Sequence, residues 1–327
     1  IKGLGSVMNT LLSVIIPSFN EEGMIHKTSQ TISRILEDNG ISYELIFVND
    51  GSTDNTWVKI QSETEHNSCI KGINFSRNFG KESAIYAGLF YSSGDCCVVI
   101  DCDLQHPPEK IVEMYRLWEN GYEIIEGIKH SRGQNESRTH FFAAKCFYKI
   151  ISRLTDIDMS RASDFKLLDR KAVNALLNIK EKNAFFRALS SWIGFKTTTV
   201  EFDVREREIG ETKWSTWALV KYAVSSISSF SAAPMQIVSL LGSVMLLISL
   251  VLGGIALYQK ATGTALEGFT TVIIINLFTG SIIMLSLGII GYYISKIYDE
   301  IQGRPKYIVR GTCGDLKNTP KEPKDIL

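Results

Sequence analysis

The sequence predicts an α/β domain with a mostly parallel sheet, followed by an apolar membrane anchor. Two observations carry this prediction. Short apolar runs alternate with segments of helical periodicity over residues 11–130, which is the pattern of βαβ units. Further along the chain, residues 222–295 hold two charged residues, Lys260 and Glu267, although 21% of all residues are charged. We therefore expect a water-soluble part joined to a lipid-compatible part.

Each element of the soluble part follows from its periodicity or from its place in the alternation. Residues 12–16 are a short apolar run, which is typical of a buried strand. Residues 22–38 place apolar side chains on one side of a predicted helix. Ligands of such a sheet bind at the carboxyl ends of its strands. The other expected strands are 43–48, 70–75, 96–100 and 123–126, and the other expected helices are 54–63, 81–91 and 108–118.

Charge and composition exclude several classes of protein. The chain has 35 Lys and Arg against 35 Asp and Glu, and this zero net charge argues against a protein built mainly to bind nucleic acid. Seven prolines and 25 glycines in 327 residues exclude a collagen-like or proline-rich chain. None of the six cysteines forms a C-x-x-C pair, so we expect reduced thiols and neither a structural zinc site nor a disulfide framework.

Two apolar segments, 237–257 and 269–293, are long enough to cross a membrane. A helix of the first segment's length spans about 31 Å, close to the thickness of a hydrocarbon core. The alternative is a pair of buried core helices. Two spans would place both termini on the same side of a cell membrane. The basic residues that flank the spans predict that this is the cytoplasmic side. These residues are Lys213, Lys221, Lys296, Arg304, Lys306 and Arg310.

Residues 214–234 form a distinct segment before the first apolar run. Trp214, Trp217 and Val220 recur at steps of three residues, and Val224 follows four residues later. This spacing predicts an amphipathic helix that lies in the membrane interface with its tryptophans at headgroup level. An ordinary helix packed on the soluble domain is the alternative interpretation.

The strongest site signal is a pair of carboxylates, Asp101 and Asp103, after the apolar run at 98–100. In extended backbone, residues i and i+2 point the same way, so the two carboxylates would converge and repel unless a cation lies between them. Oxygen ligands of this kind suit Mg²⁺ or Mn²⁺, which in turn bind a diphosphate. A solvated turn is the alternative.

Acidic residues also follow the first two strands. Glu21 lies after the run at 12–16, and Asp50 lies after the run at 43–48. Both are expected at the same edge of the sheet, where they would bind the base and ribose of a nucleotide. Each taken alone also fits a turn with a helix N-cap.

These residues belong to motifs that occur together in a known family. The motifs are SVIIPSFNEE (13–22), VNDGST (48–53), SRNFGKE (76–82), IDCDLQHPP (100–108), SDFKLLDR (163–170) and GETKW (210–214). Over about residues 11–310 the chain resembles family 2 glycosyltransferases. It is most similar to the group that contains bactoprenol (undecaprenyl-phosphate) glucosyltransferases and dolichyl-phosphate mannose synthase.

The resemblance implies a GT-A fold, a Rossmann-like mixed sheet that binds nucleotide-diphospho-sugars. It also implies transfer of one sugar from a nucleotide-sugar, such as UDP-glucose, to a polyprenyl phosphate at the cytoplasmic leaflet. Alternatives are UDP-N-acetylglucosamine or GDP-mannose as donor, another lipid as acceptor, or a non-catalytic module that binds nucleotide-sugars. Relatives further suggest a homo-oligomer such as a tetramer. The expected parts are an extension (1–10), a cytoplasmic catalytic domain (11–213), an interfacial helix (214–234), a two-helix anchor (235–295) and a cytoplasmic tail (296–327), disordered from Gly311.

The resemblance assigns roles to individual residues. The nucleotide is expected to contact Pro17, Phe19, Glu21 and Asp50. The metal and the diphosphate are expected to bind at Asp101 and Asp103. Arg207 and Lys213 match basic positions that contact diphosphate or lipid phosphate in relatives, and Asp164 matches an Asp regarded there as a catalytic base. Two positions depart from the pattern: His106 stands where many relatives have Asp, and Asn49 replaces the first Asp of D-D-G-S.

The chemistry of the acceptor limits what a catalytic base has to do. A phosphate monoester has a second pKa of about 6, so it is largely dianionic at neutral pH. Asp164 is therefore either a base or a group that orients a cation or the acceptor. In-line attack would invert the anomeric configuration. The further candidates for binding the lipid phosphate are Arg77, Lys81, Arg138 and Lys145, each of which is otherwise a surface cation.

Overall fold

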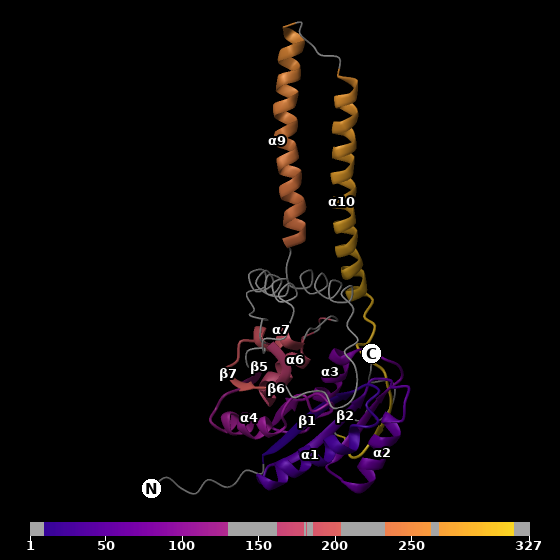
Figure 1. Cartoon of the computed structure of the whole chain (residues 1–327), viewed down its shortest axis with the longest axis vertical. Helices are drawn as coiled ribbons and strands as arrows, with labels where there is room; N and C mark the ends of the chain where they lie inside the picture. The colour runs from indigo at the N-terminus through magenta and orange to yellow at the C-terminus, as the bar shows by residue number, and fades with distance from the viewer. Residues whose placement is uncertain are drawn as a thin grey trace. The chain divides into compact units, whose positions relative to one another are not determined.

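The computed structural model describes residues 10–129, 162–179, 181, 186–203, 233–262 and 268–316. The chain divides into two compact units. The first holds an α/β domain together with the segment from Arg304 onward, and the second holds two long helices. Figure 1 shows both units.

The α/β domain is built on one sheet of eight strands in the order β7-β5-β6-β4-β1-β2-β3-β8. Its strands are β1 (Leu11–Ser18), β2 (Ser42–Asn49), β3 (Ile70–Phe75), β4 (Cys96–Val99), β5 (Ile124–Lys129), β6 (Ala162–Asp169), β7 (Thr197–Phe202) and β8 (Val309–Cys313). Its helices are α1 (Ile25–Asp38), α2 (Thr56–His66), α3 (Lys81–Tyr91), α4 (Glu109–Glu119), α6 (Arg170–Leu177) and α7 (Phe186–Trp192). Every strand and helix expected over residues 11–130 is present.

The sheet is mixed, which confirms what the family resemblance implied, whereas the alternation of strands and helices alone had predicted a mostly parallel sheet. β1 pairs in parallel with β2 and β4, and β2 pairs in parallel with β3, so the alternating first part of the chain behaves as predicted. β6 then runs antiparallel to both β4 and β5, while β7 is parallel to β5. β6 and β7 lie beyond residues 11–130, the part of the chain in which the alternation of strands and helices could be predicted. The arrangement is the mixed sheet of a GT-A-like fold.

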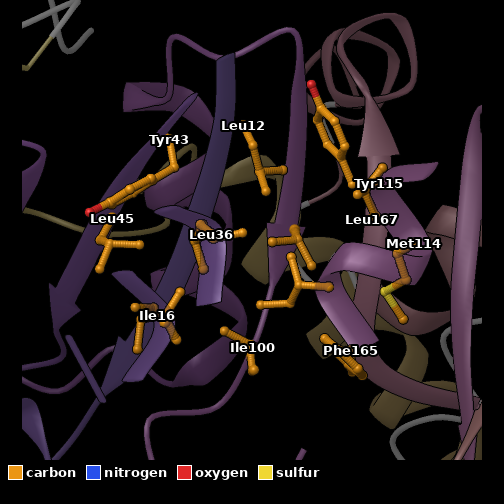
Figure 2. Packing of buried hydrophobic residues seen from close by; sticks show 14 of the residues in the cluster. Leu12, Ile16, Leu36, Tyr43, Leu45, Ile100, Met114, Tyr115, Phe165 and Leu167 are labelled. Carbon is orange, nitrogen blue, oxygen red and sulfur yellow. The ribbon is translucent and has the colours of Figure 1, made fainter. Parts of the chain in front are cut away.

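The core lies on both faces of the central strands. β1 is buried along nearly its whole length, as expected of a parallel strand covered by helices on each side. Figure 2 shows Leu12 and Ile16 of β1 beside Leu36 of α1 and Leu45 of β2, all fully buried. The candidate site lies at the carboxyl ends of β1 and β2, beside this core.

The segment that follows the second long helix returns to the sheet. β8 pairs antiparallel with β3 and so covers an edge of the sheet. Tyr307, just before β8, stacks on Phe75 with ring centroids 5.1 Å apart. The expectation of disorder from Gly311 is therefore wrong for residues 311–316. Its composition suggested a solvated tail, but the backbone of this segment pairs with the otherwise open edge of β3.

The described part of the second unit contains α9 (Ala233–Ala261) and α10 (Phe269–Ile301), of 29 and 33 residues. Both predicted apolar segments are thus helical. Among the described residues, one stretch, Phe278–Tyr298, is long and apolar enough to cross a membrane, with a mean hydropathy of 1.5 and none of it buried. The same criterion identifies no second span in the part of the chain that the structure describes. The predicted interfacial helix at 214–234 lies outside the described residues except for its last two, which begin α9.

Candidate functional site

A pocket of about 390 Å³ opens where β1, β2 and β4 end. All six residues predicted to bind the nucleotide, metal and diphosphate line it, although they come from three separate strand ends. Among the described residues, the lining is formed by Pro17, Ser18, Phe19, Glu21, Asp50, Asn78, Gly80, Lys81, Ala84, Asp101, Cys102 and Asp103. The carboxyl ends of parallel strands meet at one edge of a sheet, and this explains why these six residues, which lie far apart in the sequence, line one pocket.

Asp50 lines the pocket and also binds the loop that follows β3. Its two carboxylate oxygens accept hydrogen bonds from the backbone N–H groups of Phe79 and Gly80, at 2.7 and 2.9 Å. Burial raises the pKa of Asp50, although these two hydrogen bonds oppose the shift. Each carboxylate oxygen has a second lone pair, so Asp50 retains capacity for a ligand while it orders the loop.

Gly51 allows this loop to approach so closely. Its φ is +64°, a conformation that side chains rarely adopt, and a Cβ there would collide with the backbone of Arg77 and Asn78. The turn is further shaped by Asn49, which donates to Asn74 Oδ1 at 2.8 Å. Asn49, the departure from D-D-G-S, therefore contributes to the architecture of the turn, and Asp50 is the acid that reaches the pocket.

Asp101 and Asp103 lie in a turn and not in the strand. β4 ends at Val99, so the argument from extended backbone, which had the two side chains point the same way, does not apply to them. Asp103 Oδ1 accepts a hydrogen bond from the backbone N–H of Gln105 at 3.1 Å. Leu104, which lies between Asp103 and Gln105, has a φ of +55°. Both aspartates nevertheless reach the same pocket.

Lys81 bridges two carboxylates of the site. Its Nζ lies 2.5 Å from Oδ1 of Asp101 and 2.8 Å from Oδ2 of Asp164. Burial disfavours both the charge on Lys81 and the charge on Asp101, but the attraction between them raises the pKa of Lys81 and lowers that of Asp101. Lys81 is exposed, as a surface cation would be, but it is paired with two carboxylates of the site.

Asp164, on β6, is held by a second cation that the sequence analysis missed. Arg187 Nε lies 2.6 Å from Oδ1 of Asp164, and Arg187 Nη2 lies 2.8 Å from Oδ2. Burial opposes ionisation of the Asp164 carboxyl, but Lys81 and Arg187 outweigh burial and hold its pKa well below the usual range. Asp164 is thus a buried carboxylate that stays ionised between two positive charges.

Helix α7 presents Arg187, and buried polar contacts fix this helix. The side chain of Lys166 on β6 is fully buried, and its Nζ donates to the backbone oxygen of Arg187 at 3.2 Å and to Ser190 Oγ at 2.7 Å. Glu82 of α3 accepts from the backbone N–H of Phe186 at 2.9 Å. Burial and the nearby Asp164 raise the pKa of Glu82 to about 7. These contacts fix the position from which Arg187 reaches Asp164.

His106 occupies a largely apolar environment at the edge of the site. It stacks on Phe165 at a centroid distance of 5.2 Å and meets Phe202 edge to face at 5.3 Å. Its Nδ1 is 3.8 Å from Oδ2 of Asp101, beyond hydrogen-bonding distance. Burial lowers the pKa of His106. An aspartate at this position would place a charge against two aromatic rings, so the departure from the family pattern matches its surroundings.

The remaining predicted phosphate ligands fall into two groups. Arg207, Lys213, Arg138 and Lys145 lie outside the described residues. Arg77 is described, and its guanidinium lies over the ring of Phe79, 4.4 Å from the centroid. Arg77 is thus part of the loop that Asp50 binds.

The pocket suits a divalent cation that binds together with a ligand. No cluster of three metal-binding side chains occurs among the described residues. Asp101 and Asp103 supply two carboxylates, and Mg²⁺ is commonly held by one or two carboxylates together with substrate phosphates and water. The donor set therefore fits Mg²⁺ or Mn²⁺ bound with a diphosphate.

Comparison with known proteins identifies the family. The model of glycosyl transferase family 2 matches residues 13–177, which include most of β1, the whole of β2 to β6 and all the pocket residues. The chain belongs to glycosyltransferase family 2.

Several members of the family are similar over nearly the whole chain. An uncharacterized glycosyltransferase from Synechocystis is 39% identical over 96% of this chain and 99% of its own length. A prophage bactoprenol glucosyl transferase homolog from Escherichia coli is 33% identical over 91% of this chain and 98% of its own. Among solved structures, glucosyl-3-phosphoglycerate synthase from Mycobacterium tuberculosis is 19% identical over 67% of this chain and 79% of its own, with a TM-score of 0.47.

Proposed function

We propose that this glycosyltransferase transfers one sugar from a nucleotide-sugar, in the first instance UDP-glucose, to a polyprenyl phosphate such as undecaprenyl phosphate. The observation that carries the proposal is that one pocket brings together Pro17, Phe19, Glu21, Asp50 and the carboxylates of Asp101 and Asp103. Relatives named as bactoprenol glucosyl transferases support the lipid acceptor. UDP-N-acetylglucosamine, GDP-mannose or another lipid acceptor remain alternative substrates.

In this proposal the pocket residues divide between two tasks. Phe19 and Glu21 contact the nucleoside, and Asp50 both contacts it and holds the loop at 79–80 in place. Asp101 and Asp103 hold Mg²⁺ or Mn²⁺, which neutralises charge on the departing nucleoside diphosphate when it is bound. Arg207 and Lys213 are proposed to add charge-assisted hydrogen bonds to phosphate oxygens.

We assign Asp164 an orienting role. Its carboxylate is already bound by Lys81 and by the fork of Arg187. The acceptor phosphate is largely dianionic near neutral pH, so its oxygen needs no base to attack the sugar. Asp164 then fixes two cations beside the pocket, and in-line attack inverts the anomeric carbon.

A product assay tests the proposal. Purified protein is incubated with undecaprenyl phosphate, Mn²⁺ or Mg²⁺ and a panel of nucleotide-sugars, and mass spectrometry of the lipid fraction identifies the transferred sugar. Asp103→Asn should abolish transfer while the protein stays folded. Asp38→Asn, which changes an exposed carboxylate on α1, serves as the matched control. Full activity of Asp103→Asn, or a product with retained anomeric configuration, would contradict the assignment.

The proposed location is a cell membrane, with two spans formed by α9 and α10 and the catalytic domain on the cytoplasmic side. An exposed residue between the helices, Thr262, and an exposed residue of α2, Glu65, provide reporters. Each is changed to cysteine in a chain whose partly exposed Cys69 and Cys313 are replaced by serine. An impermeant maleimide should label the Thr262→Cys chain in intact cells and the Glu65→Cys chain only after permeabilisation. Labelling of both in intact cells would exclude this topology. A homo-oligomer, such as a tetramer, stays a prediction that light scattering of the solubilised protein checks.

A further inference from the structure

The pocket is strongly acidic, and Lys81 is the one cationic side chain among its described lining residues. Glu21, Asp50, Asp101 and Asp103 contribute four carboxyl groups to the same lining. Asp164 adds a fifth carboxylate, which reaches Lys81 from β6. Like charges this close together are unfavourable unless a cation lies between them. Lys81 therefore supplies positive charge that the pocket needs.

The position of Lys81 resembles that of a bound metal ion. Its ammonium lies 2.5 Å from an oxygen of Asp101 and 2.8 Å from an oxygen of Asp164. An oxygen of Asp101 that is occupied by an ammonium is not free to bind a divalent cation in the same geometry. The side chain of Lys81 is 41% exposed, whereas that of Asp164 is 5% exposed. Lys81 thus has open space on the pocket side and a fixed anion behind it.

From this geometry we propose that Lys81 is an exchangeable counter-ion for Asp101. Its ammonium neutralises Asp101 in the protein without donor and gives up that carboxylate when a divalent cation binds. It stays paired with Asp164, where the ammonium is available to phosphate oxygens of the substrate. This inference rests on the proposed function for the identity of the metal site. It makes Lys81 a positioning residue whose release is coupled to metal binding.

The coupling has two consequences with opposite signs. Removal of the ammonium should make Asp101 a better ligand for a divalent cation in the absence of donor. Removal of the second anion, Asp164, should leave Lys81 more firmly bound to Asp101 and should weaken metal binding. A lysine that merely held the local structure together would weaken metal binding when it was replaced.

The proposal is tested by measuring the affinity of the full-length protein for Mn²⁺ in the absence of the nucleotide-sugar donor. Electron paramagnetic resonance reports the concentration of free Mn²⁺ at each step of the titration. We expect Lys81→Met to bind Mn²⁺ on the order of tenfold more tightly than the unmodified chain, the size of a typical coupling between two sites. Asp164→Asn should bind it more weakly. Lys110→Met is the matched control because Lys110 pairs with Glu113 on α4, away from the pocket lining, and its Mn²⁺ affinity should not change. An unchanged or weaker affinity of Lys81→Met overturns the proposal, as does the absence of Mn²⁺ binding to the unmodified chain.

Thermal unfolding provides a second measurement. Without Mn²⁺, Lys81→Met should have a lower Tm than the unmodified chain, since Asp101 has lost its partner, and saturating Mn²⁺ should raise its Tm by a larger amount. If Lys81→Met does not fold, Lys81→Gln and Asp164→Asn carry the same test. An equal Tm increment in variant and unmodified chain counts against the exchange.

The two proposals fail separately. Normal sugar transfer by the unmodified protein with no gain in Mn²⁺ affinity for Lys81→Met would reject the counter-ion role and leave the proposed function standing. A gain in Mn²⁺ affinity in a protein that transfers no sugar to polyprenyl phosphate would support the counter-ion role and reject the proposed function.

Discussion

Arg187 binds both carboxylate oxygens of Asp164 in a fork, with N–O distances of 2.6 and 2.8 Å. Asp164 is almost fully buried and accepts a third contact from Lys81. A planar guanidinium fixes the direction of a carboxylate as well as its charge. The orientation of Asp164 toward the pocket therefore depends on α7, an element that contributes nothing to the pocket lining.

Arg187→Lys should impair transfer even though it keeps the charge. The fork is lost, and a displacement of about 1 Å in a positioned group can lower the rate on the order of 10²-fold. We expect kcat to fall by roughly that factor, with little change in the KM for the nucleotide-sugar, and stability to fall by about 2 kcal/mol. Arg116→Lys changes an exposed ion pair on α4 and should leave kcat and stability unchanged. A rise in KM at constant kcat would instead place Arg187 in donor binding.

The sequence alone indicated that the pocket residues would lie together, because each of them follows a strand of the predicted parallel sheet. Asp50 and Asp101 follow parallel strands, and parallel strands end at one edge of the sheet. Arg187 follows no such rule, since it reaches Asp164 only because α7 packs against β6, and Lys166 and Glu82 fix that packing. Likewise, β8 became a strand only because the edge of β3 was available to it. Long-range packing decided the features that periodicity did not predict.

Gly51→Ala should weaken donor binding without unfolding the domain. A residue with a side chain costs about 1–2 kcal/mol in the left-handed region, and the added Cβ would also press on the backbone of Arg77 and Asn78. The loop must then move, and the hydrogen bonds from Phe79 and Gly80 to Asp50 are strained. Calorimetric titration with UDP-glucose should show affinity lower by roughly tenfold, equivalent to about 1.4 kcal/mol.

Gly40→Ala is the matched control for this experiment. Gly40 has a similar φ of +65° but no atom within 4 Å of the added Cβ, and it lies outside the pocket lining. It should lower stability by a similar conformational cost and leave donor affinity unchanged. Equal affinities for the two variants would show that the contact between the two loops does not shape the pocket.

Glu44 should make the stability of the domain depend on pH in the acid range. Burial opposes its ionisation, but Lys71 at 2.7 Å, Ser13 at 2.5 Å and Ser93 at 2.6 and 2.8 Å outweigh burial and lower its pKa from the ordinary value of 4.5. A carboxyl with a depressed folded-state pKa contributes stability above its unfolded pKa and loses it as the pH falls through the folded value. The contribution is therefore present at pH 7, begins to be lost as the pH falls below the ordinary pKa of 4.5, and is gone once the pH is below the folded-state pKa.

Glu44→Gln isolates this contribution. The variant leaves Lys71 without its carboxylate, so we expect urea unfolding at pH 7 to show a loss of about 2–3 kcal/mol. The difference from the unmodified protein should narrow as the pH falls below 4.5. The exposed, helix-surface variant Glu113→Gln should show neither effect. A constant difference between pH 7 and pH 3 would mean that lost packing, and not the ionised carboxylate, explains the destabilisation.

Tyr307→Ala should destabilise the catalytic domain although residue 307 lies far from it in sequence. The ring stacks on Phe75 at an interplanar angle of 10°, and the neighbouring Lys306 lies over the ring of Tyr86, 4.5 Å from the centroid. Loss of the ring removes an aromatic pair and part of the packing that holds β8 on β3, at a cost of about 2 kcal/mol. Ile308→Ala, which truncates an exposed neighbour, should cost much less, and the Tm of the solubilised protein measures both. Equal Tm shifts would show that backbone pairing alone holds β8, whereas a selective loss for Tyr307→Ala would show that this aromatic stack fastens the segment after α10 to the sheet.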